Sequence, residues 1–215
     1  MIIKKVGIVN YGSGNILSVR RAFEHIGSDV TYADSHDMAR VDLLVLPGVG
    51  AFPHAIDSLY SSGMRNIVSN FADSGRPILG ICLGMQMLFQ KSYELGQTNG
   101  LGFLDGQVEH IHKCLSVRSV GNKYPVPHIG WNRLSINPEQ TTRYPFSSSL
   151  SGFFYFVHSY MAINVPRENV LAVAHYGDLE IPAAVTNGVV TGCQFHPEKS
   201  GEHGLNFLKN YLASI

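Results

Sequence analysis

The chain has 215 residues, a formal net charge of zero and only 15% charged residues, so it lacks the strongly basic character that attracts nucleic acids or anionic membranes. Its length and its 45% hydrophobic content suit one soluble globular domain, which we expect to span residues 1–215. Its three cysteines, Cys82, Cys114 and Cys193, form no disulfide framework, and no apolar run is long enough for a signal peptide or a membrane span. We therefore expect a soluble cytoplasmic protein.

The first half of the chain alternates predicted strands and helices. The apolar strands are expected at Val6–Val9, Asp29–Tyr32, Asp42–Leu46 and Pro77–Ile81. The helices are expected at 15–25, with Asn15 as the cap, and at Pro53–Tyr60, Met64–Ser74 and Leu83–Lys91. Such alternation predicts a parallel sheet that is covered by helices on both faces.

Strand-like runs dominate after Gly96. They cover Gln107–Ile111, Arg133–Ile136, Phe153–Met161, Val170–Tyr176 and Ala183–Phe195, and a last helix is expected at Leu205–Ala213. The last run contains Asn187-Gly188, a strong two-residue hairpin signal. The predicted fold class is α/β, with a doubly wound, mostly parallel sheet flanked by helices and an added β-rich portion in the C-terminal half.

The segment Gly80-Ile81-Cys82-Leu83-Gly84 is the most informative in the chain. An apolar strand runs directly into Gly-x-Cys-x-Gly and then into a helix, which is the context of a nucleophile elbow with cysteine in place of serine. The sharp turn requires small neighbours, and the start of a helix favours the thiolate form of cysteine. A lone cysteine is more often a packing residue, but this context predicts a nucleophile at Cys82.

A cysteine nucleophile needs a base, and the base needs a group that orients it. His196 and Glu198 are two residues apart in Gln194-Phe195-His196-Pro197-Glu198, so in an extended chain they project to the same side. On its own this sequence would read as an ordinary strand end. Together with the elbow, it predicts a Cys82–His196–Glu198 triad.

Acyl chemistry also needs N–H donors for the oxyanion of the tetrahedral intermediate. Elbow geometry supplies the backbone N–H of Leu83. The loop Pro47-Gly48-Val49-Gly50 follows a central strand, and its glycines let the backbone approach a ligand closely. We assign the second donor to the Val49 N–H. We expect neither a cofactor nor a metal ion.

Together these segments resemble the class I, triad-type glutamine amidotransferases. The likeness is closest to the glutaminase subunits of imidazole glycerol phosphate synthases, and it runs from about residue 6 to residue 212. Six segments carry it: Asn10–Asn15, Leu46–Gly50, Gly80–Gln86, Pro127–Asn132, Phe154–Tyr160 and Gln194–Ser200. The resemblance implies that L-glutamine is split to glutamate and ammonia. It further implies that ammonia passes to a (β/α)8-barrel cyclase subunit, in a heterodimer that makes imidazole glycerol phosphate and an aminoimidazole carboxamide ribotide for histidine biosynthesis.

The resemblance also implies further site residues. Positions that match glutamine contacts are Gly50, Gln86, Glu94, His158, Ser159 and Tyr160, and positions that match the partner surface are Asn15, Trp131 and Lys199. At Glu94 the sequence departs from the family, because Tyr93 interrupts the more usual acidic pair. Without the resemblance, His158 and Tyr160 would read as strand packing residues and Lys199 as a solvated lysine.

Three other functions stay open on the sequence. One is a stand-alone cysteine hydrolase of the same fold, which would work without a partner. Another is a paralogous amidotransferase subunit that supplies ammonia to a different synthetase, for example in surface-sugar biosynthesis. A non-catalytic subunit with a relic site is disfavoured, because every position of the triad is filled.

Overall fold

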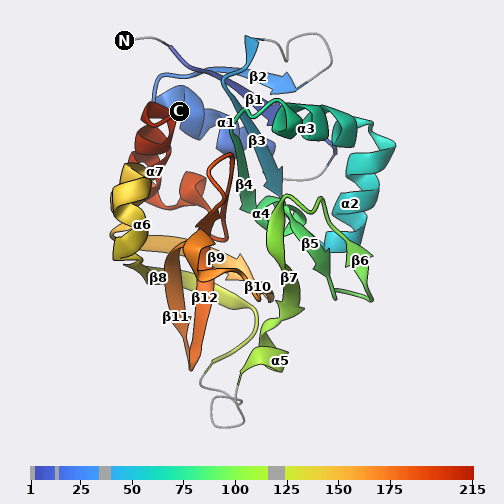
Figure 1. Cartoon of the computed structure of the whole chain (residues 1–215), viewed down its shortest axis with the longest axis vertical. Helices are drawn as coiled ribbons and strands as arrows, with labels where there is room; N and C mark the ends of the chain where they lie inside the picture. Colours follow the sequence, from blue (N-terminus) through green and yellow to red (C-terminus); the bar gives the residue numbers. More distant parts are fainter. Residues whose placement is uncertain (1–2, 13–14, 34–39, 116–123) are drawn as a thin grey trace.

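The computed structural model describes residues 3–12, 15–33, 40–115 and 124–215 (Figure 1). Within these ranges, nine strands form one sheet in the order β2-β1-β3-β4-β13-β12-β11-β8-β9. A second sheet has the order β10-β7-β5-β6. The segment Asn10–Asn15, which carries part of the family resemblance, includes Ser13 and Gly14, which lie outside the described residues.

The first five strands of the large sheet run parallel to one another. They are β2 (Asp29–Ala33), β1 (Lys5–Val9), β3 (Leu43–Gly48), β4 (Ile78–Cys82) and β13 (Val190–Cys193). Every residue of β3 and β4 is buried, as expected for strands covered on both faces. Side chains alternate, so Leu43 and Val45 belong to one core cluster while Leu44 and Leu46 belong to the other.

Helices cover both faces of the parallel strands. One core cluster takes in residues of α1 (Ile16–His25) and α7 (Gly201–Ala213), and the other takes in residues of α2 (Phe52–Ser61) and α3 (Met64–Asp73). Figure 1 shows these two pairs on opposite sides of the strands. No helix among the described residues is long and apolar enough to cross a membrane.

Antiparallel strands extend the same sheet on one side. They are β12 (Leu179–Thr186), β11 (Val170–Tyr176), β8 (His128–Ile136) and β9 (Phe153–His158), and they are joined by antiparallel pairings from β13 outward. The α/β fold class is confirmed. The β-rich portion makes the described sheet evenly mixed, with four parallel and four antiparallel pairings.

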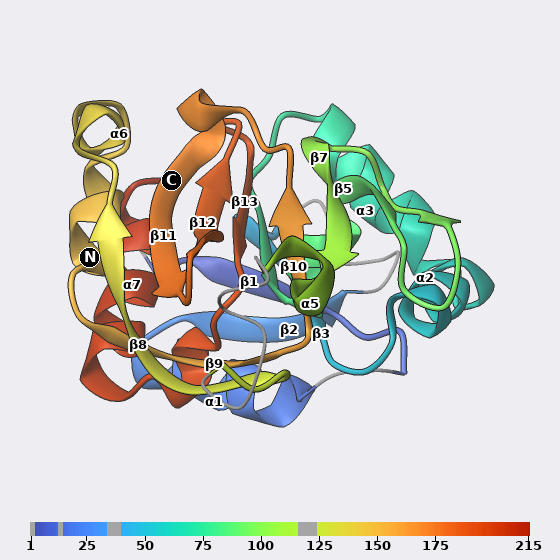
Figure 2. The same cartoon turned by 90° about the horizontal axis from the view of Figure 1, so that it is seen from below.

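The second sheet consists of β5 (Phe89–Ser92), β6 (Thr98–Asn99), β7 (Leu104–His110) and β10 (Tyr160–Ile163). Its buried residues Phe89, Leu104, Val108 and Ala162 join the core cluster of α2 and α3. Figures 1 and 2 both place this sheet on the α2 and α3 side of the large sheet. The shorter elements are α4 (Leu83–Met87), α5 (Ile111–Cys114), α6 (Pro138–Arg143) and the 3-10 turns Pro145–Leu150, Arg167–Asn169 and Pro197–Lys199.

Several predicted boundaries were wrong. The helix expected over Leu83–Lys91 ends at Met87, because Phe89–Ser92 pairs with β7 and forms β5. The run Phe153–Met161 is two strands in two different sheets, separated at Ser159. The predicted strand Gln107–Ile111 corresponds to β7, and Ile111 begins α5.

The predicted hairpin is confirmed, but three residues, 187–189, connect β12 and β13 instead of two. Gly188 has a φ of +101°, and the carboxamide oxygen of Asn187 accepts hydrogen bonds from the backbone N–H groups of Val189 and Val190. The turn returns the chain from β12 into β13, which lies between β4 and β12. β13, the last of these strands in the sequence, therefore lies in the centre of the large sheet.

Candidate active site

Cys82 lies at the junction of β4 and α4. Its φ of 55° and ψ of −111° are a strained backbone conformation for a residue with a side chain, as in a nucleophile elbow. A Cβ at Gly84 would lie 1.8 Å from the carbonyl oxygen of Leu46, and one at Gly80 would lie 2.8 Å from the Cα of Met85. The expectation that both neighbours must be small is therefore confirmed by the packing.

The helix that follows Cys82 is shorter than predicted. Since α4 has five residues, its dipole is weaker than that of the expected nine-residue helix. Hydrogen bonds and nearby charges must therefore provide more of the stabilisation of a thiolate at this position.

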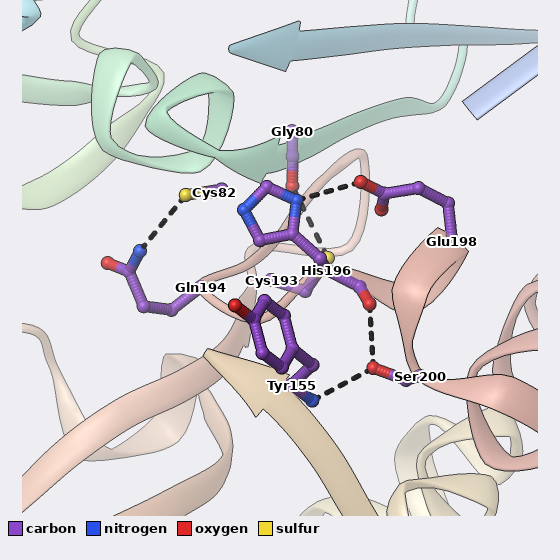
Figure 3. A network of polar contacts seen from close by, with 8 residues as sticks. All are labelled: Gly80, Cys82, Tyr155, Cys193, Gln194, His196, Glu198 and Ser200. Atoms are coloured by element: carbon purple, nitrogen blue, oxygen red, sulfur yellow. Dashed lines mark hydrogen bonds and ion pairs between the residues drawn. The ribbon is translucent and has the colours of Figure 1, made fainter. Parts of the chain in front are cut away.

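β13 brings the predicted base, His196, close to the predicted nucleophile, Cys82. It runs parallel to β4 with Cys193 opposite Ile81, so the chain leaves both strands at the same edge of the sheet. The Nδ1 of His196 lies 2.8 Å from Oε1 of Glu198, and these side chains are only 3% and 1% exposed. The His196 Nε2 is buried and has no hydrogen-bond partner among the described residues. Figure 3 shows the imidazole between the Cys82 sulfur and the Glu198 carboxylate.

The charge state of His196 follows from these neighbours. Burial alone would lower the pKa of the imidazole, but the interactions with Cys82 and with the hydrogen-bonded Glu198 outweigh it and raise the pKa to about 10. At neutral pH the structure therefore favours an imidazolium at His196, next to the Cys82 sulfur. A protonated imidazole next to a cysteine sulfur is typical of sites that activate a cysteine nucleophile.

Two buried glutamines connect the elbow to the strand of the base. The Nε2 of Gln86 donates to the backbone oxygen of Tyr160 at 2.9 Å and to Oε1 of Gln194 at 2.8 Å. The Nε2 of Gln194 in turn lies 3.8 Å from the Cys82 sulfur (Figure 3). Sequence reasoning missed Gln194 as a site residue. Its place two residues before His196, on the same side of an extended chain, is the signal that could have found it.

A cavity of about 430 Å³ opens over Cys82 and His196. Its other lining residues include all the predicted oxyanion and glutamine positions: Val49, Gly50, Leu83, Gln86, Glu94, His158, Ser159 and Tyr160. Pro127 and Val157, which were not predicted, complete the lining. A wider groove of about 720 Å³ lies along β10 and β11, away from the cysteine.

Two of the predicted glutamine positions have protein partners of their own. Oε2 of Glu94 accepts a hydrogen bond of 2.8 Å from the backbone N–H of Phe52, at the start of α2. The ring of His158 is buried between His128 and the Tyr160 carbonyl, and burial lowers its pKa to about 3. His158 is therefore neutral, and its imidazole contributes no positive charge to the cavity.

Two of the three predicted partner positions, Trp131 and Lys199, lie near Tyr155 of β9. The ring of Trp131, which is 55% exposed, packs edge-on against the Tyr155 ring at 6.1 Å between centroids, and the Nζ of Lys199 lies 6.0 Å from it. Tyr155 also lies 6.4 Å from the His196 ring, and sequence reasoning missed it. Asn15 begins α1, which packs against the turn Pro197–Lys199, but its side chain makes no capping hydrogen bond.

Exposed apolar side chains gather on one face of β8 and β9. The register places Ile129 opposite Val157 and Trp131 opposite Tyr155, so these side chains share a face of the strand pair. Ile129 and Phe153 are 60% and 51% exposed. An exposed apolar patch of this kind is typical of a surface that binds another protein.

Comparisons with known proteins show what the whole chain is similar to. The family model for class I glutamine amidotransferases matches residues 7–215. The chain is 43% identical to imidazole glycerol phosphate synthase subunit HisH of Caldanaerobacter subterraneus subsp. tengcongensis, over 96% of each chain. It is 41% identical to the subunit of the same name from Lactococcus lactis, over 99% of this chain and all of the relative. Among solved structures, PurLQS from Thermotoga maritima superposes with a TM-score of 0.72 at 20% identity, covering 99% of both chains.

Proposed function

Because the chain belongs to the class I glutamine amidotransferase family, we propose that it is the glutaminase subunit of an imidazole glycerol phosphate synthase. It hydrolyses L-glutamine to glutamate and ammonia for histidine biosynthesis. One observation carries the proposal: relatives that match nearly the whole chain at 41–43% identity all bear the name of that synthase subunit. The same observation favours the histidine pathway over a paralogous synthetase or a stand-alone hydrolase.

The catalytic roles follow from the geometry of the triad. The Cys82 thiolate attacks the side-chain amide carbon of glutamine, and the tetrahedral oxyanion accepts hydrogen bonds from the backbone N–H groups of Leu83 and Val49. His196 gives its proton to the departing ammonia, which leaves a thioester on Cys82. The imidazole then takes a proton from water, which attacks the thioester and releases glutamate. Glu198 keeps the Nδ1 proton of His196 in place and stabilises the imidazolium.

The cavity supplies contacts for the rest of the glutamine. Glu94 is the only carboxylate among its lining residues, and we assign it to the α-ammonium group. Oε2 of Glu94 already accepts a hydrogen bond from the backbone N–H of Phe52, so Oε1 is the oxygen that would bind the α-ammonium group. Backbone and hydroxyl donors of Ser159 and Tyr160, with the backbone of His158, bind the α-carboxylate. Gly50 and Gln86 complete the wall around the side-chain amide.

The Pro47–Gly50 loop gates hydrolysis in this proposal. A single Val49 peptide between two glycines can rotate at low steric cost, so either its N–H or its carbonyl can face the oxyanion. Losing one such donor lowers the rate roughly 10²- to 10³-fold. A partner that shifts the population of the two orientations by a few kcal/mol would therefore switch hydrolysis on. Such gating avoids the loss of free ammonia when no acceptor is present.

The partner is a (β/α)8-barrel cyclase subunit, which receives the ammonia and forms imidazole glycerol phosphate and aminoimidazole carboxamide ribotide. We place its docking surface around Asn15, Trp131 and Lys199. The exposed apolar face of β8 and β9 supports this placement, because Tyr155 connects it to His196. We also propose that the complex works in the cytoplasm.

The test separates ammonia production from ammonia use. Cys82→Ala in the assembled complex should abolish product formation with glutamine, because the nucleophile is lost. Synthesis from added ammonium should persist, because the acceptor chemistry belongs to the cyclase. Cys114→Ala is the matched control and should retain both activities, since Cys114 lies in α5 outside the cavity. Loss of both activities in an assembled Cys82→Ala complex would contradict the proposal.

A further inference from the structure

Two buried histidines face each other across β8 and β9. His128 and His158 are register partners, and Nδ1 of His128 lies 3.0 Å from Nε2 of His158. The His128 ring stacks on Phe156 and is 4.2 Å, centroid to centroid, from the ring of Tyr176. The triad uses neither histidine as a base, so the pair calls for a separate explanation.

The position of every hydrogen in this pair is determined by its partners. Nδ1 of His158 lies 2.8 Å from the backbone oxygen of Tyr160, which can only accept, so Nδ1 carries the hydrogen. Burial lowers the pKa of His158 to about 3 and that of His128 to about 4, so both rings are neutral. Nε2 of His158 therefore accepts, and Nδ1 of His128 donates. The remaining nitrogen of His128 faces the amide nitrogen of Asn132 at 3.5 Å as an acceptor.

The Tyr160 carbonyl fixes a second set of orientations. Nε2 of Gln86 lies within hydrogen-bond distance of two oxygens, that of Tyr160 and Oε1 of Gln194. If the Gln86 amide were turned over, its own oxygen would face the Tyr160 carbonyl, which cannot donate. Gln86 must therefore donate to both oxygens. Gln194 then presents its N–H group, and not its carbonyl, to the Cys82 sulfur at 3.8 Å.

We propose that Gln194 is a catalytic residue whose amide N–H stabilises the Cys82 thiolate, and that the His128–His158 pair positions it through the Tyr160 carbonyl and Gln86. The inference rests on the proposed function only in taking Cys82 as the nucleophile. A thiolate is a stronger acceptor than a neutral thiol, so an N–H donor lowers the free energy of the charged form. The opposite amide orientation would place a carbonyl dipole against the thiolate.

The pair matters because the Tyr160 oxygen is shared. His158 and Gln86 both donate to it, so the position of this carbonyl determines where the Gln86 amide can lie. His158 in turn is held by the hydrogen bond from His128. A break at His128 leaves the buried Nε2 of His158 without a donor, and the ring and the carbonyl can then move.

The test measures the pH midpoint of Cys82 alkylation by iodoacetamide in the full-length chain, read at that residue by mass spectrometry. Gln194→Met removes the donor at similar volume and should raise the midpoint by roughly 1 to 2 pH units, the range for a hydrogen bond to a charged group. If Gln194→Met does not fold, Gln194→Glu replaces it, and its carboxylate should also raise the midpoint. An unchanged midpoint in the folded variant overturns the role of Gln194. The other titratable groups around Cys82, which are His196, Glu198, Glu94, His158, Tyr160 and Cys193, stay the same in both variants.

A second pair of variants tests the positioning step. His128→Asn places an amide N–H near the position of Nδ1 and should keep the midpoint close to that of the native chain. His128→Leu removes the donor and should raise the midpoint in the same direction as Gln194→Met. If His128→Leu lowers the melting temperature without moving the midpoint, His128 is merely structural and the positioning role is wrong. The measurement needs neither glutamine nor a partner, so a failure of the proposed function would leave its outcome readable.

Discussion

Gly84→Ala offers a sharp test of how the elbow is built. Its Cβ would lie 1.8 Å from the Leu46 carbonyl oxygen, whereas real Cβ contacts below 3.0 Å are essentially never seen. The start of α4 would therefore have to move away from β3 by more than about 1 Å. Overpacking of this kind costs about 1–3 kcal/mol, which lowers the melting temperature by roughly 2–12 °C in a chain of this length.

The same movement displaces Cys82 and the Leu83 N–H, so activity should fall further than stability does. A misplacement of about 1 Å can cost on the order of 100-fold in rate. The assay is glutamate release by the assembled complex, compared with thermal unfolding of the same variant. Gly63→Ala is the control, because its φ of +74° strains an added side chain in open space and Gly63 does not line the cavity over Cys82. If Gly84→Ala and Gly63→Ala lose equal activity at equal loss of stability, the steric argument fails.

Three further outcomes are expected. A glutamine analogue with an electrophile at the amide carbon should label Cys82 and neither other cysteine, and peptide mapping that finds the label elsewhere would overturn the assignment. The raised pKa of His196, about 10 against an ordinary 6.5, means that its protonated form stabilises the fold fully below pH 6.5 and that this stability is lost as pH rises through about 10. Glu198→Gln should therefore lower the unfolding free energy, measured by denaturant titration, by about 1–2 kcal/mol at pH 6.5. The difference from the native chain should shrink toward pH 10. A difference that does not change with pH would count against the pairing of His196 with Glu198. Gly50→Ala should change the ratio of glutamine hydrolysed to product formed more than it changes the melting temperature. Gly50 lies in the proposed gating loop with a φ of +97°, and an added Cβ would meet nothing within 4 Å. An unaltered ratio would mean that the glycine serves only the turn.

The sequence predicts the residues of the proposed triad because its chemistry demands particular residues in local patterns. Cys82 between two glycines and His196 two residues from Glu198 are each readable within a few positions of sequence. Their meeting depends on β4 and β13 being neighbours, which a parallel sheet with its active site at the carboxyl edge supplies. Gly48 shows a limit of the same reasoning. It looks as replaceable as Gly50, but a Cβ there would lie 2.8 Å from the backbone nitrogen of Gly84, so its replacement would disturb packing as well as gating.

The strand at Phe89 and the roles of Gln194 and His128 could not be predicted from the sequence, because they depend on contacts between distant segments. Phe89 follows four helix-compatible residues, and only its pairing with Leu104 makes it a strand. Gln194 looks like one more polar residue until Gln86, 108 residues away, fixes its amide. His128 likewise gains its meaning from His158 on the neighbouring strand. Local patterns predict which groups react, whereas the groups that orient them emerge only from tertiary packing.

The central position of β13 has a consequence for the order in which the protein is made. Synthesis delivers the cysteine strand early, but the strand that carries the base is inserted beside it almost at the end, and α7 then closes the core on that side. A nascent or truncated chain that ends before this strand has a thiol without its imidazole. Pairing of such distant segments is a slow, late event in folding. A chain that has not yet placed β13 beside β4 therefore cannot bring His196 to Cys82.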